Sequence, residues 1–450
     1  MIMGNSDLFN LECARSQQDV DKVNKTFYEK YNYPWPPMIF EAVADQRFSV
    51  HMLHQDIGDW SHTRLGDTPN IWVAGCGTNQ ALLTALKFPE STILGTDISV
   101  ESLEICKKNA AQIGINNLVL EEKSINDVRE TERFDYILCT GVIHHNADPK
   151  VPLEKISSAL KPNGILELMV YNYYHRILTT AFQKAVRSLC KSGTLPDFGK
   201  EMACTQQLIK RFPIQNLMAN FLSQCAKMPE AAIADSLLQP VEYSYTIESL
   251  AALVQSCGLE LLLPCVNQFD KTVDNYSFNL PFEDSELAHQ YESLSDIQRW
   301  QIGNLLMVER SPMLWFYLQR EDSGSCRKTE PQVCQEFLDT TFEKTSTTTK
   351  RYVLNAEKEY AHSSKGGSLP VPSSPANGLA RKVYENTTPN KPMRKIFEKL
   401  DIAPSFQNAN SLRIALTTSA FPYLESQGKE ETRLNQVRNN ISGFWDRLVK

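Results

Sequence analysis

Two glycines one residue apart break an apolar run in the stretch IWVAGCGTNQ, residues 71–80. Gly75 and Gly77 carry no Cβ, so the chain can turn sharply and its backbone can approach a ligand closely. Asp97 follows 20 residues after Gly77, and a carboxylate there could accept hydrogen bonds from ribose hydroxyls. This pattern predicts a nucleoside-binding turn. A purely structural turn, and a helix cap at Asp97, are the alternatives.

The third position of a dinucleotide fingerprint, Gly-x-Gly-x-x-Gly, is Gln80 in this sequence. A glycine there allows a helix to pack closely around a pyrophosphate. Its absence disfavours a nicotinamide-dependent oxidoreductase and favours a nucleoside cofactor without phosphates.

His144 and His145 stand together in the stretch HHNADP, in a chain that has 8 histidines in all. Histidine is the side chain best suited to proton transfer near neutral pH, so both are candidate catalytic residues. A structural role in shaping the loop before Asp148 is an equally open alternative. We expect no metal ion, because there is no Cys-x-x-Cys pair and Asp148 has no second acid beside it.

These residues need a scaffold, and short apolar runs alternate with segments of helical spacing around them. Strands are predicted at 70–74, 91–97, 116–122, 134–141 and 165–172, with helices between them. This alternation is typical of an α/β fold with a parallel sheet covered on both faces. Ligands bind such sheets beyond the C-terminal ends of the strands, where the glycine turn and Asp97 are placed.

Four stretches, VAGCGTNQALLTAL, ILGTDIS, FDYILCTGVIHHNADP and ALKPNGILELMVY, resemble the successive motifs of class I S-adenosylmethionine-dependent methyltransferases. The resemblance covers residues 65–175 closely and extends more loosely to about 320. There YTIESLAALVQSCGLELLLP looks like the family's next helix and sixth strand, and SPMLWFYLQR looks like its seventh strand. It implies a Rossmann-like, doubly wound, seven-stranded and mostly parallel sheet, with S-adenosylmethionine as the cofactor. Insertions at about 176–240 and 266–310 would form a substrate cap.

The resemblance also implies roles for single residues. Gly75 and Gly77 would lie along the methionine and ribose of the cofactor, and Asp97 would bind the ribose hydroxyls. The family usually has an acid near Ser124 that holds the adenine amino group, and serine is a departure from that pattern. The predicted cofactor contacts are Ala74, Gly75, Cys76, Gly77, Asp97, Ile98, Ser124, Ile125, Asn126, Thr140 and Gly141.

Polar aromatic residues on both sides of the core are the predicted acceptor contacts. Tyr171, Asn172, His175 and Arg176 follow the fifth strand, where an acceptor would bind; an aromatic seam packing the next helix is the alternative. The segment FYEKYNYPWPPM, residues 27–38, resembles a Tyr-Pro-rich lid found in a bacterial, often cyanobacterial, branch of the family. Its Tyr31, Tyr33 and Trp35 would contact substrate, or would clasp the N-terminal helix to the sheet.

We therefore expect three regions: an N-terminal helical and aromatic lid at 1–64, the methyltransferase domain at 65–320, and a small C-terminal α+β module, winged-helix-like, at 321–450. Residues 321–450 carry a net charge of +4 and residues 1–320 a net charge of −11. Because phosphate contacts need a basic face, nucleic acid is an unexpected partner for this core. No apolar run is long enough for a membrane span and no signal peptide is evident, so we expect a cytoplasmic protein with reduced thiols.

The predicted function is transfer of a methyl group from S-adenosylmethionine to an O or N nucleophile of a small molecule or peptide, and the resemblance implies a role in secondary metabolism. The chain has no Asn-Pro-Pro-Tyr or Asp-Pro-Pro-Tyr tetrapeptide of the kind used on exocyclic amines of nucleic acids. A cofactor-binding regulatory protein without turnover is the first alternative, and a protein or RNA methyltransferase is another. The sequence makes no prediction of the oligomeric state.

Overall fold

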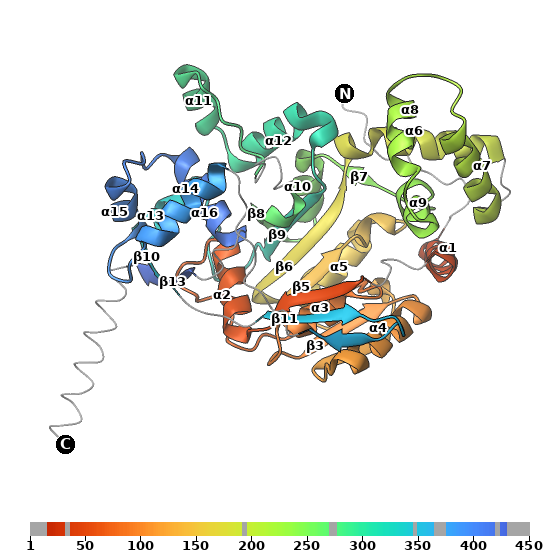
Figure 1. The fold of residues 1–450 in the computed structure, drawn as a ribbon, viewed down its shortest axis with the longest axis horizontal. Helices are drawn as coiled ribbons and strands as arrows, with labels where there is room; N and C mark the ends of the chain where they lie inside the picture. Colours follow the sequence, from red (N-terminus) through yellow and green to blue (C-terminus); the bar gives the residue numbers. More distant parts are fainter. Residues whose placement is uncertain are drawn as a thin grey trace.

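The computed structural model of the chain describes residues 16–31, 37–190, 196–269, 277–344, 349–363, 375–418 and 424–429. A twisted central sheet forms the middle of the molecule, with one lobe of helices at each end (Figure 1). Along the sheet the strands are β4 (Leu118–Glu122), β3 (Ile93–Asp97), β2 (Ile71–Ala74), β5 (Phe134–Thr140), β6 (Leu160–Asn172), β9 (Leu314–Arg320) and β8 (Leu259–Pro264). β9 runs antiparallel to both of its neighbours, whereas β4, β3, β2, β5 and β6 pair in parallel. The predicted Rossmann-like, seven-stranded, mostly parallel sheet is confirmed, and a short strand, β7 (Ser244–Tyr245), pairs with the end of β6.

The middle of this sheet is buried on both faces, and β2 is apolar and buried along its whole length, whereas the edge strand β4 is partly exposed and ends in two glutamates. Tyr136 and Leu138 point to a core shared with α2 (Gln46–Asp56), α3 (Gln80–Lys87) and α4 (Val100–Ile113). Ile137 and Cys139 point to the opposite core, shared with α5 (Lys150–Ala159), α10 (Ile247–Gln255) and α12 (Asp296–Met307). The helices fix the strand ends and therefore the loops that carry the candidate site.

A separate apolar core joins the N-terminal helix to the first insertion. α1 (Gln17–Lys30) contributes Phe27, which packs with Phe182 of α6 (Tyr173–Cys190) and Phe198 of α7 (Phe198–Lys210). α8 (Leu217–Cys225) and α9 (Glu230–Leu237) complete this group. We call α1 and α6 to α9 the cap lobe; α6 to α9 form the right-hand side of Figure 1. α1 thus belongs to the same lobe as the insertion predicted to form the substrate cap.

The C-terminal region packs against the rest of the chain instead of standing apart from it. β1 (Ile39–Val43) pairs antiparallel with β11 (Thr349–Leu354), which pairs with β12 (Tyr360–His362). Trp60 packs against Phe337 with ring centroids 5.5 Å apart, and both lie in the core on the α5 face of the sheet. The remaining elements are α11 (Ser285–Glu292), α13 (Glu330–Asp339), β10 (Thr340–Lys344), α14 (Pro375–Asn386), α15 (Met393–Lys399), α16 (Phe406–Thr418) and β13 (Leu424–Lys429), where β13 pairs with β10.

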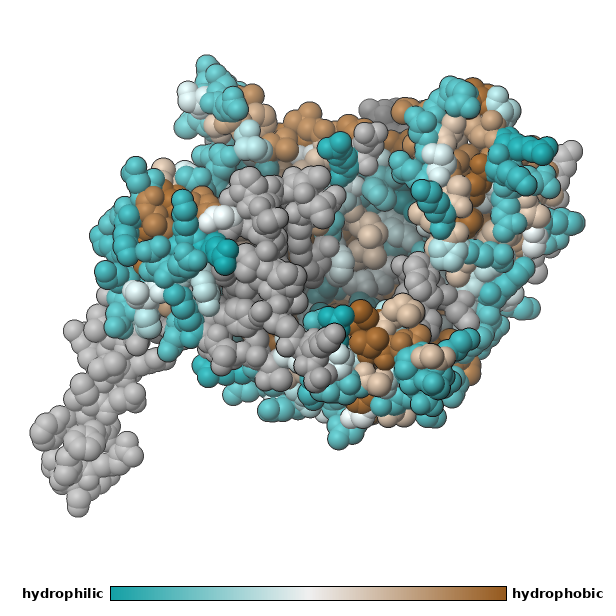
Figure 2. Space-filling view, in the orientation of Figure 1, coloured by the Kyte–Doolittle hydropathy of each residue, from teal (hydrophilic) through white to brown (hydrophobic). Residues whose placement is uncertain are grey.

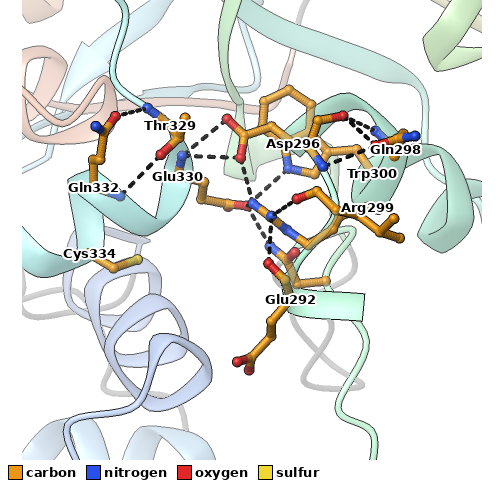
Figure 3. Close-up of polar contacts among 12 residues, drawn as sticks. Glu292, Asp296, Gln298, Arg299, Trp300, Thr329, Glu330, Gln332 and Cys334 are labelled. Atoms are coloured by element: carbon orange, nitrogen blue, oxygen red, sulfur yellow. Dashed lines mark hydrogen bonds and ion pairs between the residues drawn. The ribbon is translucent and has the colours of Figure 1, made fainter. Parts of the chain in front are cut away.

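A buried network of charges ties α12 to the start of α13 (Figure 3). Asp296 accepts from Nη2 of Arg299 (2.5 Å), from Nη2 of Arg327 (2.6 Å) and from the backbone N–H of Glu330 (3.1 Å). The Glu330 carboxylate accepts from Nε1 of Trp300 (3.0 Å). Because an ion pair out of water is stable only when its partners are all in place, this network holds the C-terminal region in one position.

Candidate functional site

The turn after β2 brings the two glycines to the C-terminal edge of the sheet. Gly75 has a φ of +66° and Gly77 a φ of +52°, a region in which a residue with a Cβ is strained. A Cβ on Gly75 would lie 2.3 Å from Cγ2 of Val142, so this backbone also passes close to the turn after β5. The Cys76 N–H donates to the carbonyl of Thr96 (2.9 Å) and continues the β2–β3 pairing into the turn.

Two backbone amides anchor the carboxylate of Asp97 at the end of β3. Its Oδ2 accepts from the N–H of Gly77 (2.8 Å), and its Oδ1 accepts from the N–H of Ser99 (2.9 Å). Burial raises the pKa of Asp97, and these hydrogen bonds oppose the rise. A carboxylate offers about four lone-pair positions, more than the backbone amides occupy, so acceptor capacity remains for a ligand hydroxyl. Ile98 follows, half-buried at the same edge.

The loop after β4 meets helix α1. Ser124 donates through Oγ to Oδ2 of Asp21 on α1 (2.9 Å) and accepts from the N–H of Asn126 (3.2 Å). The Asn126 amide donates to Oδ1 of Asn146 (2.8 Å), and the same oxygen accepts from Nε2 of Gln17 on α1 (2.9 Å). Asp21 therefore places a carboxylate beside Ser124, the position at which the sequence lacks the expected acid.

The end of β5 closes the edge on its other side. Gly141 follows Thr140 with a φ of +79°, and its N–H donates to the carbonyl of Met169 on β6 (3.1 Å). Gln80, which stands in the third glycine position, donates through Nε2 to Oγ1 of Thr140 (2.6 Å) and so links α3 to β5. The other predicted cofactor contacts, buried in the core behind this edge, are Ala74, Cys76 and Ile125.

The two histidines form a buried pair in a short turn, Ile143–His145. His145 donates from Nδ1 to the carbonyl of Val241 (2.7 Å), because a carbonyl only accepts, and this makes Nε2 the basic nitrogen. Among the described residues neither ring nitrogen of His144 has a hydrogen-bond partner, and its ring centroid lies 4.1 Å from that of Tyr171. Burial lowers the pKa of both histidines, strongly for His144, so both are neutral near pH 7.

Tyr171 and Arg176 lie beside this histidine pair. The Arg176 guanidinium stacks over the Tyr171 ring at 4.2 Å from its centroid. It also forms a buried ion pair with Glu242, with Nε 2.8 Å from Oε1 and Nη2 2.5 Å from Oε2. Burial by itself would raise the pKa of Glu242, but Arg176 holds that pKa below its ordinary value. The charge of Arg176 is therefore balanced inside the protein.

The other predicted acceptor contacts lie in different surroundings. Asn172 is fully buried, and its Nδ2 lies 2.6 Å from Oδ1 of Asn304 on α12, so its amide joins the sheet to that helix. His175 is exposed on the first turn of α6. Tyr31 is buried in the cap lobe and donates to the carbonyl of Phe198 (3.3 Å). Tyr33 and Trp35 lie outside the described residues.

Three side chains at this edge were not among the predicted site residues: Tyr28 of α1, Asp235 of α9, and Gln239 just after α9. Gln239 donates through Nε2 to Oη of Tyr28 (3.0 Å) and to Oδ1 of Asp235 (2.9 Å). Burial raises the pKa of Tyr28 well above its ordinary value, and the nearby charges of Asp235, Tyr171 and Asp97 raise it further. The available sequence signal was an acid within the apolar helix AAIADSL.

The surface of the molecule is hollowed beside the cap lobe (Figure 2). Two separate cavities, of about 380 and 440 Å³, lie against α12, the first also against α10 and the second also against α16. The described part of the chain contains no group of three His, Cys, Asp or Glu side chains that could hold a metal ion. Within the same residues no helix combines the length and the apolar character that crossing a membrane requires.

Residues 74–222 match a family model described as a methyltransferase domain. The chain is 27% identical over 248 residues to an uncharacterized protein of Synechococcus sp., covering 54% of this chain and 58% of that protein. It is 29% identical over 104 residues to the ubiquinone biosynthesis O-methyltransferase of Haemophilus ducreyi, covering 22% of this chain and 43% of that enzyme. The chain thus spans about half the length of these relatives.

The fold is similar to that of PKMT2 from Rickettsia typhi. Two solved structures of that protein, one in complex with AdoHcy, give TM-scores of 0.52 and 0.51 at 17% and 18% sequence identity. They cover 88% and 87% of this chain and 77% of their own chains. A similarity of this extent includes regions outside the central sheet as well as the sheet itself.

Proposed function

The chain belongs to the class I S-adenosylmethionine-dependent methyltransferases, and from this premise we propose that it transfers a methyl group from S-adenosylmethionine to an O or N nucleophile of a small molecule or peptide. The observation that carries the proposal is the meeting of two sets of residues at one edge of the sheet. The glycine turn and Asp97 form one set, and the buried polar group around His144 and Tyr171 forms the other. One set suits a nucleoside cofactor, and the other suits the group that receives the methyl.

The residues at the strand ends fit the cofactor. A Cβ on Gly75 would meet Val142 at 2.3 Å, so the turn that approaches the cofactor needs glycine there, and Asp97 keeps acceptor capacity for ribose hydroxyls. Thr140 and Gly141 would lie along the methionine side, and Ile98 and Asn126 would lie near the adenine. When bound, S-adenosylmethionine supplies an activated methyl group on a positively charged sulfur.

The remaining chemistry falls to residues of the chain. His145 presents an unprotonated Nε2, because its Nδ1–H is held by the carbonyl of Val241, so it can accept a proton from an O or N nucleophile. His144 stays neutral and fills the space beside Tyr171. In this proposal the cap lobe holds the nucleophile in line with the methyl group and keeps water away from it. Alignment and loss of hydration together supply much of the rate of a displacement reaction.

Several features support a small molecule or peptide as the acceptor. The region of residues 1–320 carries a net charge of −11, which disfavours a polyanion such as RNA. The name of the Haemophilus ducreyi relative refers to a small molecule, ubiquinone. We extend the proposal to a cytoplasmic site of action, because ten cysteines lie in the described residues and none of these forms a disulfide there.

Label transfer tests the proposal. The purified chain is incubated with methyl-labelled S-adenosylmethionine and an extract of its native host, and small molecules are then separated from macromolecules. Label in the small-molecule or short-peptide fraction is the expected result. Label in protein or RNA would overturn the acceptor class, and cofactor binding without any transfer would favour the regulatory alternative. His145→Ala should lower turnover while leaving the affinity for S-adenosylmethionine unchanged; full turnover would remove its role as the base.

A further inference from the structure

The cap lobe places an unpaired carboxylate on the acceptor side of the site. Asp235 lies in α9, and among the described residues no Lys, Arg or His side chain forms an ion pair with it. Its polar contact is the amide of Gln239, 2.9 Å away, which also donates to Oη of Tyr28 at 3.0 Å. We call Tyr28, Gln239 and Asp235 the α9 triad.

The nearest basic side chain does not neutralise Asp235. Arg176 lies close enough to lower the pKa of Asp235, but its guanidinium is paired with Glu242 through two hydrogen bonds. Burial outweighs Gln239 and Arg176 and raises the pKa of Asp235 to about 6. At pH 7 Asp235 is therefore mainly ionised, and the acceptor side of the site carries one uncompensated negative charge.

A second observation points to a ligand at the same place. Gln239 is fully buried, and its Oε1 has no partner among the described residues although both hydrogens of its amide nitrogen are used. A buried carbonyl without a partner is costly unless a ligand donates to it. Asp235, Gln239 and Tyr28 therefore offer three oxygen acceptors, one of them unfilled.

The α9 triad lies close to the reacting edge. The carbonyl of Ser236, next to Asp235 in the chain, accepts from Nη2 of Arg176 (3.1 Å), and Arg176 lies over the Tyr171 ring at 4.2 Å from its centroid. Tyr171 in turn packs against His144, with 4.1 Å between ring centroids. The α9 triad therefore lies on the side of the site that holds Tyr171 and the histidine pair.

We propose that the acceptor presents a primary amine, that this amine enters as an ammonium ion, and that Asp235 is its counter-ion, with Gln239 as the residue that positions Asp235. An ammonium has three N–H donors and no acceptor, which matches the three oxygens of the α9 triad and their single charge. The inference rests on the proposed function and narrows its acceptor class from O or N to N.

In the transfer step the ammonium first releases one proton to Nε2 of His145, the base of the proposed function, which passes it on to water. The nitrogen lone pair then forms the new N–C bond while the S–C bond breaks, and its electron pair stays on sulfur. The products are a methylammonium ion, whose charge Asp235 again balances, and the neutral thioether S-adenosylhomocysteine. No oxidant or reductant is needed.

The test uses the full chain, S-adenosylmethionine with a ¹³C-labelled methyl group, and the host extract, either untreated or with its amines acetylated. The expected result is an N-methyl signal in the nuclear magnetic resonance spectrum of the untreated sample and its loss in the acetylated one. An O-methyl signal, or a signal that survives acetylation, would overturn the amine inference and leave the proposed function standing. No transfer at all would overturn both.

Variants on one helix test the role of Asp235. Asp235→Asn should lower kcat/KM for the labelled acceptor by about thirtyfold or more, because an ammonium would lose its counter-ion. Asp235→Glu should recover part of the loss, and Glu230→Gln, an exposed acid on the same helix, is the matched control. Unchanged affinity for S-adenosylmethionine would show that the folded site persists. If Asp235→Asn keeps full activity, or if Asp235→Glu is folded and as impaired as an Ala variant, the counter-ion role is wrong.

Discussion

The carboxylate of Asp97 accepts a hydrogen bond from the backbone N–H of Gly77 at 2.8 Å, across the two strand ends that the sequence separates by 20 residues. This contact fixes the glycine turn against β3. It also orients the carboxylate, whose remaining lone pairs face away from the two backbone donors. A strand end, a turn and a charged side chain thus form one rigid unit.

Asp97→Asn is expected to weaken S-adenosylmethionine binding by about ten- to a hundredfold. An amide keeps the size of the side chain but replaces one acceptor with a donor, which would oppose the N–H of Gly77 or of Ser99 and remove a charge-assisted bond to the ribose. Isothermal titration calorimetry measures the affinity. Glu101→Gln, an exposed change on the following helix, is the control. Equal affinities for Asp97→Asn and the wild type would remove the ribose role.

Gly75→Ala should impair both folding and cofactor binding. The new Cβ would need a φ of +66° and would lie 2.3 Å from Cγ2 of Val142. The conformational strain alone is about 1–2 kcal/mol. Adding Val142→Ala removes the closest overlaps, those with Cγ2 and Cγ1, but not the strain, so the double variant should recover part of the free energy of unfolding. Chemical denaturation measures both variants, and an unaltered Gly75→Ala protein would contradict this account of the turn.

Asp21→Ala should loosen helix α1 and weaken S-adenosylmethionine binding severalfold. The substitution removes the acceptor of the Ser124 hydroxyl and breaks one of the links between α1 and the loop after β4. Limited proteolysis should cut the variant within α1 faster than the wild type, and bound cofactor should slow this cleavage. Lys22→Ala, an exposed neighbour on the same helix, is the control. If cofactor binding is unchanged, α1 serves only to support the cap lobe.

The buried histidine predicts a loss of stability in acid. His144 has a pKa well below 6.5 in the folded protein, whereas in the unfolded chain it titrates near 6.5. The unfolded state therefore binds more protons as the pH falls below 6.5, and the stabilising contribution of neutral His144 is lost in that range. Melting temperatures measured from pH 7.5 to about pH 5 should fall less steeply for His144→Leu than for the wild type. Asp235, whose pKa is raised, changes the stability in the opposite direction over this range. Because the wild type and His144→Leu both contain Asp235, its contribution cancels when the two proteins are compared at the same pH. Parallel curves would place His144 in contact with solvent.

Removing Glu330 should destabilise the whole chain. Glu330→Ala removes one acidic neighbour of Arg299, which keeps Asp296, and one of Arg413, and it leaves the Trp300 N–H without an acceptor. By analogy with other broken buried pairs this costs about 3–5 kcal/mol. Urea denaturation gives the free energy of unfolding. Glu385→Ala, which breaks an exposed ion pair on α14, should change it by less than about 1 kcal/mol. Similar effects of the two substitutions would mean that the network in Figure 3 adds little to the junction of α12 and α13.

The local pattern of the sequence by itself determined the sheet, the glycine turn and the position of Asp97 at a strand end. Apolar runs and the absence of a Cβ act on neighbouring residues, so they can be recognised without knowing the fold. Only the tertiary structure decided which distant side chains lie at the C-terminal edge of the sheet. Asp21 reaches Ser124 across 103 positions of sequence, and Gln239 reaches Tyr28 across 211. The tertiary structure also directs the Asn172 side chain toward α12 and pairs β11 with β1. Such contacts depend on how whole helices and strands pack, and no short-range periodicity records them.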